Sequence, residues 1–379
     1  MLRFLDAVPE TPRPNEPTRV YGPPELSDVR RLQDVEGGPL VSVLVPTRPG
    51  EGLCSDDLLR ISALLAQVER RLRQELGGAR AAAMADRCRG VVIDVIDEPT
   101  GNGLAVYVGR GVAEAYRLRH APVDRVVIDP TFATRELEFA AHHHGRFRIL
   151  AVGSRGVRYL SADDDSVEEV QTGVFPMVTV SERSGSEMAQ WYRSIAEGLT
   201  SDSAHAELPV VFAGPRSICD WIAELAGILP VGVVDVDGST VDERSLHLIG
   251  RSLMESRVAR DRDHAFDLLD DAVLTGRAAI GLDDVWLAVK GGVADTVLVD
   301  PTVARGAWVD PSTHDIRWVD DPTVPGVIDD LVDEMIELTV LSGGSVVFSE
   351  PGGLGDDGVA AIIADAPVPV RLGRLGAVT

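Results

Sequence analysis

One stretch decides the fold of the last third of the chain: FDLLDDAVLTGRAAIGLDDVWLAVKGGVADTVLVD, residues Phe266–Asp300. It begins inside a helical pattern that ends at Leu274, and GLDDVWLAVKGGVADTVLVDP then predicts a helix followed by a strand. Further on, VIDDLVDEMIELTVLSGGSVVFSEP and GVAAIIA predict another helix and two more strands. This order of elements indicates a compact three-layer α/β/α domain over residues 256–379.

The preceding segment, residues 146–255, also alternates strands and helices. RFRILAVGSRGVRYLSADDDSVEEV predicts a strand pair around Gly153–Gly156, and SEMAQWYRSIAEGL predicts a helix. LPVVFAGP, RSICDWIAELAG and PVGVVDVDG then predict strand, helix and strand. A long helix follows from Val241 to Leu274, with a predicted interruption near Arg260. The alternation favours a second α/β layer.

The N-terminal part divides into a proline-rich arm, residues 1–38, and an α/β domain, residues 39–145. PLVSVLVPT predicts a buried strand, and SDDLLRISALLAQVERRLRQELGG predicts a helix capped by Ser55 and stopped at Gly77 and Gly78. We expect RGVVIDVID and GLAVYVG to form two strands, because the turn between them contains Asn102-Gly103. TRELEFAAHHH predicts a helix at the end of this domain. The predicted fold class is therefore α/β (α+β).

Length and composition suit a soluble protein of several domains. The chain has 379 residues, and domains run to roughly 100–200 residues each. Cys54, Cys88 and Cys219 are scattered and show no metal-ligand spacing, so a reduced, cytoplasmic setting is expected. No apolar run approaches the ~20 residues that span a bilayer, and we expect no membrane partner.

The negative charge increases along the chain. The formal net charge is -24 in total, of which residues 1–145 carry -3, residues 146–255 carry -8 and residues 256–379 carry -13. Phosphate binding needs clustered positive charge, so the total excludes a general nucleic-acid coat protein. An anionic partner is expected to meet the first third, and a basic protein surface the last third.

Sites for metals or cofactors are weak in this sequence. Asp235 and Asp237 in VVDVDG would share one strand face and are weak candidates for Mg²⁺, although Asp-Gly at a strand end is also an ordinary turn. The run His142–His144 cannot direct all its rings at one ion. SEPGGLGDDGVAA lacks the Gly-Lys-Ser/Thr ending of a phosphate loop. We predict no bound metal and no cofactor.

Several of these segments together resemble a known family, the archaeal and eukaryotic peptide-chain release factors and Pelota, in a bacterial branch. Phe266–Asp300 resembles the start of the family's third domain, and Asp333–Ala364 resembles its closing helix and strands. Arg148–Leu160 is similar to the strand pair that opens the middle domain, and Val41–Thr47 to a strand of the first. The resemblance implies three domains, the middle one ribonuclease H-like and the last one L7Ae-like.

The resemblance also implies where catalysis would reside. Release factors hydrolyse peptidyl-tRNA with a Gly-Gly-Gln loop, and the corresponding loop here lies in VSERSGSEMAQWY, at Arg183, Ser184, Gly185 and Ser186. No Gly-Gly-Gln occurs in the chain, and the stop-codon motif Asn-Ile-Lys-Ser does not occur either. Ser184 or Ser186 is interpreted as a helix N-cap, with Glu187 in the first turn. We predict no catalytic residues, and we favour a protein that is not an enzyme.

The leading hypothesis is a non-catalytic, ribosome-associated factor. The resemblance implies binding in the ribosomal A site, in hibernation, rescue or stress, and a translational GTPase is a possible partner of the acidic last domain. The N-terminal domain would contact ribosomal RNA, because arginine binds phosphate in a bidentate manner. The candidate RNA contacts are Arg70, Arg71, Arg73, Arg110, Arg117, Arg119 and Arg125.

Two alternatives stay open at this point. A metal-dependent hydrolase or nuclease would use Asp235 and Asp237 on the middle domain to activate water. A protein-interaction module that no longer binds ribosomes would explain the strong acidity of residues 146–379. A shared fold does not choose among these functions.

Overall fold

The structure, a computed structural model, describes residues 19–35, 37–172, 174–178, 185–202, 208–310, 315–319, 324 and 327–364. It is a mixed α/β protein, as predicted. The chain forms two compact units, one built from residues 1–142 and 262–379 and the other from residues 143–261. The finer domain borders drawn from the sequence, and the ribonuclease H-like and L7Ae-like assignments, stay predictions. Among the described residues, every helix is too short or too polar to cross a membrane.

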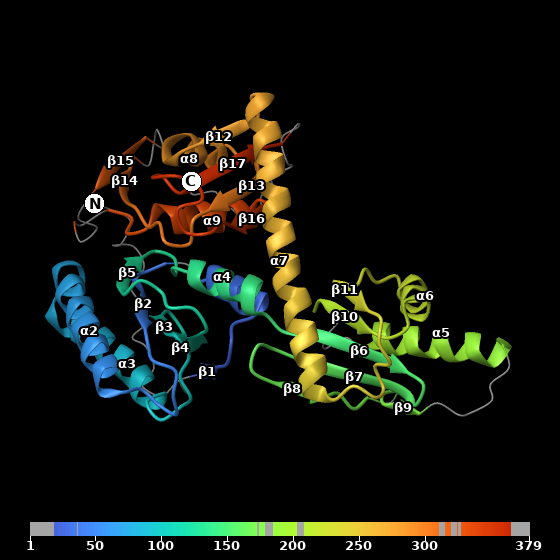
Figure 1. Ribbon diagram of the computed structural model, residues 1–379. Helices are drawn as coiled ribbons and strands as arrows, with labels where there is room; N and C mark the ends of the chain where they lie inside the picture. The colour runs from blue at the N-terminus through green and yellow to red at the C-terminus, as the bar shows by residue number, and fades with distance from the viewer. Residues whose placement is uncertain are drawn as a thin grey trace, which may run out of the picture. The chain divides into compact units, whose positions relative to one another are not determined.

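The first unit contains a sheet built by the N-terminal segment, with the strand order β1-β4-β3-β2-β5 (Figure 1). β1 pairs with β4 in parallel, and the other neighbours are antiparallel. The strands are β1 (Arg19–Tyr21), β2 (Leu40–Pro46), β3 (Gly103–Gly109), β4 (Val112–Leu118) and β5 (Arg125–Asp129). The helices of this segment are α1 (Leu26–Gln33), α2 (Ser55–Leu76), α3 (Gly78–Asp94) and α4 (Arg135–His144).

Helices cover both faces of this sheet, and its interior strand β2 is apolar on both sides. Val41, Val43 and Val45 of β2 pack into a core with α2 and α3. Leu40 and Leu44 point to the opposite face, into a core with α1 and α4. A strand alternates its side chains between faces, so a continuous apolar run such as LVSVLVP fits a strand that is buried on both sides.

One expected strand is a helix. The pattern of RGVVIDVID predicts a strand paired with GLAVYVG, but the first part of this segment lies in α3, and the hairpin joins β3 to β4 at Arg110 and Gly111. Cys88, Val91, Val92 and Val95 all lie in the core beneath the helices. Their spacing is helical, and α3 starts in an alanine-rich stretch of high helix propensity. A short apolar run fits either element by periodicity alone.

The same unit contains a second sheet, with the strand order β12-β17-β13-β16. β13 and β16 are parallel, and β17 runs antiparallel to β13 and β12. The elements are β12 (Ala278–Ile280), α8 (Leu282–Lys290), β13 (Ala294–Val299), α9 (Leu331–Leu341), β16 (Ser345–Phe348) and β17 (Val359–Ile363). A hairpin of β14 (Gly306–Val309) and β15 (Ile316–Val319) stands apart from this sheet.

The second sheet also has helices on both faces, in the three-layer order expected from the sequence. Val297 and Val299 of β13 pack with α8 and α9. Leu298 points to the other face, where it meets Ala265 and Leu269 of α7 (Glu243–Leu274). α7 runs through Arg260 without the predicted interruption, and the ion pair of Arg257 with Asp261, one turn apart at 3.3 Å, supports it there.

The second unit is built on one sheet with the strand order β11-β10-β6-β7-β8, and β9 also pairs with β7. β6, β10 and β11 are parallel, whereas β7 is antiparallel to its neighbours. The strands are β6 (Phe147–Gly153), β7 (Gly156–Ala162), β8 (Val167–Glu169), β9 (Met177–Val178), β10 (Val210–Ala213) and β11 (Gly232–Val234). α5 (Gly185–Ser201) and α6 (Arg216–Ala226) cover one face, and the start of α7 covers the other.

Candidate functional site

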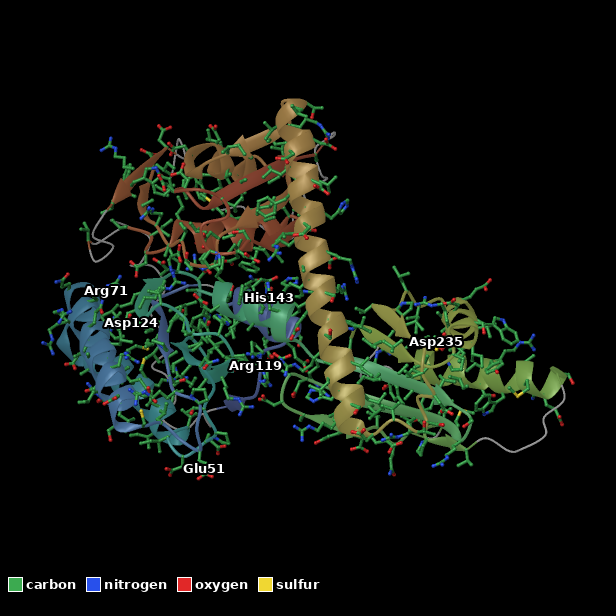
Figure 2. All side chains as sticks on the ribbon, in the orientation of Figure 1. Glu51, Arg71, Arg119, Asp124, His143 and Asp235 are labelled. Atoms are coloured by element: carbon green, nitrogen blue, oxygen red, sulfur yellow. The ribbon has the colours of Figure 1, made fainter. Side chains whose placement is uncertain are left out.

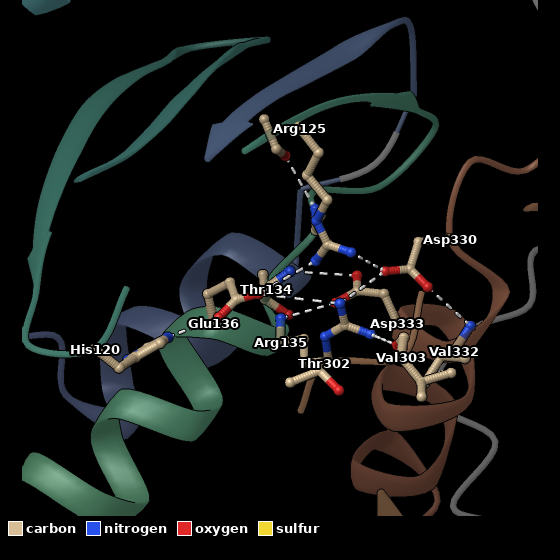
Figure 3. A network of polar contacts seen from close by, with 12 residues as sticks. His120, Arg125, Thr134, Arg135, Glu136, Thr302, Val303, Asp330, Val332 and Asp333 are labelled. Carbon is tan, nitrogen blue, oxygen red and sulfur yellow. Dashed lines mark hydrogen bonds and ion pairs between the residues drawn. The ribbon is translucent and has the colours of Figure 1, made fainter. Parts of the chain in front are cut away.

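A buried network of charged side chains joins the two sheets of the first unit (Figure 3). The N-terminal segment contributes arginines from three elements: Arg71 from α2, Arg125 from β5 and Arg135 from α4. Carboxylates at the start of α9 receive them, as the pairs described below show. The network matters for function because it determines which predicted RNA-contact arginines reach the surface.

The pair of Arg71 with Asp329 is the most direct link. One terminal nitrogen of Arg71 lies 2.7 and 2.6 Å from the two carboxylate oxygens of Asp329, and the other terminal nitrogen donates to the carbonyl of Val126 at 3.0 Å. The carboxylate of Asp329 also accepts the N–H of Ile128 at 3.0 Å. The side chains of Arg71 and Asp329 are only 9% and 3% exposed. Removal of one partner of such a pair lowers the stability of the fold, because the charge of the other partner stays buried without a counter-charge.

Asp330 serves as a helix cap and as an ion-pair partner. It is the N-cap of α9, where its carboxylate accepts the N–H of Val332 at 3.2 Å. The same carboxylate lies 2.6 Å from a guanidinium nitrogen of Arg125 and 3.3 Å from one of Arg135. Burial lowers the pKa of Arg125, but the charges of Asp330 and Glu136 outweigh burial and raise it. Arg125 is therefore held charged in the interior.

Asp333, in the first turn of α9, caps the neighbouring helix α4. Its two carboxylate oxygens accept the backbone N–H groups of Thr134 at 3.2 Å and Arg135 at 2.7 Å. These are N–H groups that a helix start leaves without an intrahelical partner, and the carboxylate also suits the positive end of the helix dipole. Burial and then the charge of Asp330 raise the pKa of Asp333 to about 7.

Two further acids complete the network. Asp129, at the end of β5, accepts the backbone N–H of Asp329 at 3.1 and 3.3 Å. Burial and then the charge of Asp329 raise the pKa of Asp129 well above its ordinary value. Glu136 lies 2.6 Å from the ring of His120; burial raises its pKa, but the His120 hydrogen bond and the nearby arginines lower it overall.

The network removes two of the predicted RNA contacts from the surface. Arg71 and Arg125 are engaged by Asp329 and Asp330 in the interior, so the expectation that they meet RNA is wrong. Arg70 and Arg110 are exposed, and Arg73 is exposed while paired with Glu69 at 2.5 Å. The other two candidates lie near the end of β4. Arg117 donates to the carbonyl of Pro99 at 3.3 Å, and Arg119 is half-buried (Figure 2).

The sequence patterns do not point to most of the network acids. One signal is available for Asp330, because an Asp that precedes an apolar helical run and is followed three residues later by another acid is typical of a helix start. Its partners have no such signal. Arg71 and Asp329 are 258 residues apart, and Arg125 and Asp330 are 205 apart. Only the packing of the two sheets brings them together.

A cleft lies beside the network in the same unit. Its volume is about 780 Å³, and it is lined by Arg125 and Asp330, by the first turn of α8 with Asp283 and Asp284, and by Trp318 of β15. The indole N–H of Trp318 donates to Asp283 at 3.0 Å. The lining contains acidic side chains, basic side chains and an indole ring, so it favours no single class of ligand.

The weak metal candidates of the middle segment lie beyond the end of β11, not on a strand face as expected. Asp235 is exposed (Figure 2). The carboxylate of Asp237 accepts the N–H and hydroxyl of Ser154, at 3.2 and 2.6 Å, and the N–H and hydroxyl of Ser239, at 3.2 and 2.6 Å. The hydrogen bond from Ser154 is the largest cause that lowers the pKa of Asp237.

This edge of the sheet is also closely packed. Ligands of α/β sheets bind at the carboxyl ends of parallel strands, which here are the ends of β6, β10 and β11. A Cβ atom on Gly153 would meet the carboxylate of Asp237, and a Cβ on Gly238 would meet the carbonyl of Ala213. Among the described residues, no three His, Cys, Asp or Glu side chains group as metal ligands. Because its carboxylate accepts hydrogen bonds from Ser154, which lies between β6 and β7, Asp237 fixes the turn between these two strands.

The loop that the resemblance equates with Gly-Gly-Gln is only partly described. Arg183 and Ser184 lie outside the described residues, so the N-cap interpretation of Ser184 stays a prediction. α5 begins at Gly185 and includes Ser186, which is exposed; Ser186 is therefore inside the helix and is not its N-cap. Glu187 lies in the first turn, where its charge suits the helix dipole.

Part of the chain matches a known protein family. Residues 146–292 match the model of a family described as bacterial archaeo-eukaryotic release factor family 3. No curated protein matches the chain.

Several solved structures are similar to the chain at low identity. Dom34 of S. cerevisiae, a translation termination-like factor, is 13% identical with a TM-score of 0.40, over 72% of this chain and 76% of that one. Pelota of Archaeoglobus fulgidus is 18% identical with a TM-score of 0.30, over 69% and 76%. A ribosome-bound archaeal Pelota is 15% identical with a TM-score of 0.40, over 91% and 95%.

Proposed function

We propose that this chain, whose residues 146–292 match a bacterial family of the archaeo-eukaryotic release factors, is a cytoplasmic, ribosome-associated factor that does not hydrolyse peptidyl-tRNA. The family match carries the proposal. We further propose that it occupies the ribosomal A site in hibernation, rescue or stress, as the sequence resemblance implies.

The loop before α5 supports the non-catalytic part of the proposal. Release factors of this superfamily use a Gly-Gly-Gln loop for hydrolysis, and no such tripeptide occurs in this chain. Residues 183–186 are Arg-Ser-Gly-Ser instead. A serine replaces the first glycine, so the backbone freedom that glycine provides at a close approach is reduced. A second serine stands in place of the glutamine, so the side-chain amide is missing.

The distribution of charge supports contact with RNA through the N-terminal segment. Residues 1–145 have a net charge of only -3, against -13 for residues 256–379. Arg70, Arg73 and Arg110 are exposed on this segment. A guanidinium contacts two phosphate oxygens at once, so these three arginines are the contacts we retain for ribosomal RNA, with Arg117 and Arg119 beside them.

The acidic last segment suits a protein partner. Asp283, Asp284, Asp356 and Asp357 are exposed around the start of α8 and the loop before β17. Opposite charges speed the encounter of two proteins and exclude like-charged surfaces. We therefore propose that a basic surface of a translational GTPase docks on this segment. We do not propose the metal-dependent hydrolase, because the oxygens of Asp237 are engaged by Ser154 and Ser239.

Sedimentation of cell lysates tests ribosome binding. We expect the protein from stationary-phase source cells to migrate with ribosomal particles in a sucrose gradient at low salt. We expect it to be released at high salt, because phosphate contacts weaken as counterions compete. A protein that stays at the top of the gradient at every salt concentration and growth stage would contradict the proposal.

A release assay tests the non-catalytic part separately. Ribosomes that carry peptidyl-tRNA in the P site and an empty A site are incubated with the purified protein, and free peptide is measured. We expect no release above the rate without protein. The matched control replaces residues 184–186 with Gly-Gly-Gln in this chain. Release by the unmodified chain would show that the protein is a hydrolase.

A further inference from the structure

The buried network of the first unit contains more carboxylates than guanidiniums. Among the described residues, the buried acids of this network are Asp129, Asp329, Asp330, Asp333 and Glu136, with exposed fractions of 2–7%. They face the guanidiniums of Arg71, Arg125 and Arg135, and none of these arginine side chains is more than 14% exposed. An interior of low dielectric disfavours surplus charge, which favours the neutral form of some of these acids.

Asp129 is the acid best placed to hold a proton. Within the described part of the chain, its carboxyl group receives a single N–H, that of Asp329, shared between its two oxygens. The groups that act on it are the carboxylate of Asp329, Glu334 of α9 and the more distant guanidinium of Arg71. Arg71 binds the oxygens of Asp329 directly, at 2.6 and 2.7 Å. Where two acids share a site, the acid that lacks a directly paired cation holds the proton more tightly. Here that acid is Asp129, because Arg71 pairs with Asp329.

Asp333 provides a contrast inside the same network. Each of its oxygens accepts a backbone N–H, from Thr134 and from Arg135. Arg125 and Arg135 also act on it, against Asp330. Asp333 therefore has two N–H donors and two nearby arginines that support a charge. Among the described residues, Asp129 has one N–H donor and no ion pair.

We propose that Asp129 and Asp329 form a proton-dependent latch between the N-terminal sheet and the start of α9. The latch is closed while Asp129 carries a proton, and it loosens when that proton is lost, because two buried carboxylates then face each other beside a single arginine. A rise in pH would therefore weaken the connection between the two sheets of the unit. This inference does not depend on ribosome binding.

The direction of the pH effect follows from the raised pKa of Asp129. A free aspartate has a pKa near 3.8, so both the closed and the opened latch hold the proton below that pH. Above it, the opened form releases a proton that the closed form retains. The equilibrium constant for opening then rises by up to about tenfold per pH unit, until the pH passes the pKa of the closed form.

Hydrogen exchange tests the latch on the full chain. The N–H groups of Ile128 and Asp329 each donate to a latch carboxylate, so their protection, corrected for the intrinsic exchange rate, reports opening. In the wild type we expect protection to fall by up to about tenfold per pH unit as the pH rises above 3.8, until the pH passes the pKa of Asp129 in the closed form. In Asp129→Asn, whose amide resembles the protonated acid, we expect a shallower fall than in the wild type, because only the titration of the other network acids, such as Asp333, remains.

The comparison variant is Asp333→Asn. It leaves one N–H of α4 facing an amide NH₂ group, and we expect lower protection at every pH. If Asp129→Asn behaves in the same way, or if its pH profile runs parallel to that of the wild type, the latch is disproved.

An infrared measurement on the wild type keeps the proposal testable even if the variants do not fold. A protonated buried carboxyl group has a carbonyl band distinct from that of a carboxylate. Asp333, whose pKa is raised to about 7, contributes one such group at pH 5, so we expect a band with the intensity of more than one carboxyl group at that pH. An intensity of one carboxyl group or less at pH 5 overturns the proposal.

Discussion

At the scale of single residues, burial decides what a charged side chain does. Arg70 and Arg71 are neighbours in α2, yet Arg70 is exposed and Arg71 is buried against Asp329. Successive residues of an α-helix point about 100° apart, so one of the two meets the solvent and the other meets the second sheet. Two adjacent arginines therefore differ in environment: Arg70 lies at the surface and Arg71 lies in the interior.

Asp330 is the residue whose loss should harm the first unit most. Asp330→Ala removes the N-cap of α9 and leaves Arg125 and Arg135 buried without their shared partner. We expect the free energy of unfolding to fall by about 3–5 kcal/mol, measured as a lower transition temperature in calorimetry. The matched control, Asp124→Ala, changes an exposed acid just before β5 and should stay within about 0.5 kcal/mol. Equal effects of the two variants would contradict the role given to Asp330.

At the scale of elements, close packing matters as much as propensity. The end of β11 passes so near β6 and β10 that Gly238 has no room for a side chain. Asp237, one residue earlier, binds Ser154 after β6 and so joins the two strand ends. Gly90, in the middle of α3, has open space within 4 Å of the position that a Cβ would take. The surrounding atoms therefore forbid a side chain at Gly238 and permit one at Gly90.

Alanine at these two positions should act in opposite directions. Gly238→Ala would press a methyl group against the carbonyl of Ala213, and we expect a loss of about 1–3 kcal/mol. Gly90→Ala lies in a helix interior with free space and should gain about 0.5–1 kcal/mol. Thermal unfolding of each variant measures both effects. A stabilising Gly238→Ala would mean that the strand ends pack more loosely than the structure shows.

At the scale of the whole molecule, charge is unevenly distributed along the chain. The N-terminal third is close to neutral and the last third is strongly acidic, and the exposed arginines retained as RNA contacts belong to the former. Salt-dependent binding to a polyanion is therefore expected to depend on the N-terminal segment.

Removal of those arginines tests this division. In the triple variant Arg70→Ala, Arg73→Ala and Arg110→Ala, we expect weaker ribosome binding. We also expect a shallower salt dependence, in which the slope of log K against log salt falls by roughly 0.7–0.9 for each arginine that binds a phosphate in the wild type. Arg244→Ala, at an exposed arginine of the other unit, is the control and should leave the slope unchanged. An unchanged slope in the triple variant would locate the RNA-binding surface elsewhere.

Much of the architecture is predictable from the sequence. The mixed α/β class, the three layers of the last third, the strand at Leu40–Pro46 and the helix ending at Gly77 all follow from local patterns of apolar residues and glycine. Such patterns report on neighbours within a few residues, and they fail where two elements satisfy the same pattern. The run Arg89–Asp97 is the example, because an apolar stretch of that length fits a strand or a helix.

Only the tertiary structure decided the candidate site. Arg71 and Arg125 look like surface arginines in the sequence, and they become internal because Asp329 and Asp330 meet them from more than 200 residues away. Asp237 resembles a metal ligand in the sequence, but in the fold Ser154 and Ser239 bind it. A side chain's charge, pKa and accessibility depend on what surrounds it in three dimensions, and the sequence alone determines which residue types are present but not which of them meet.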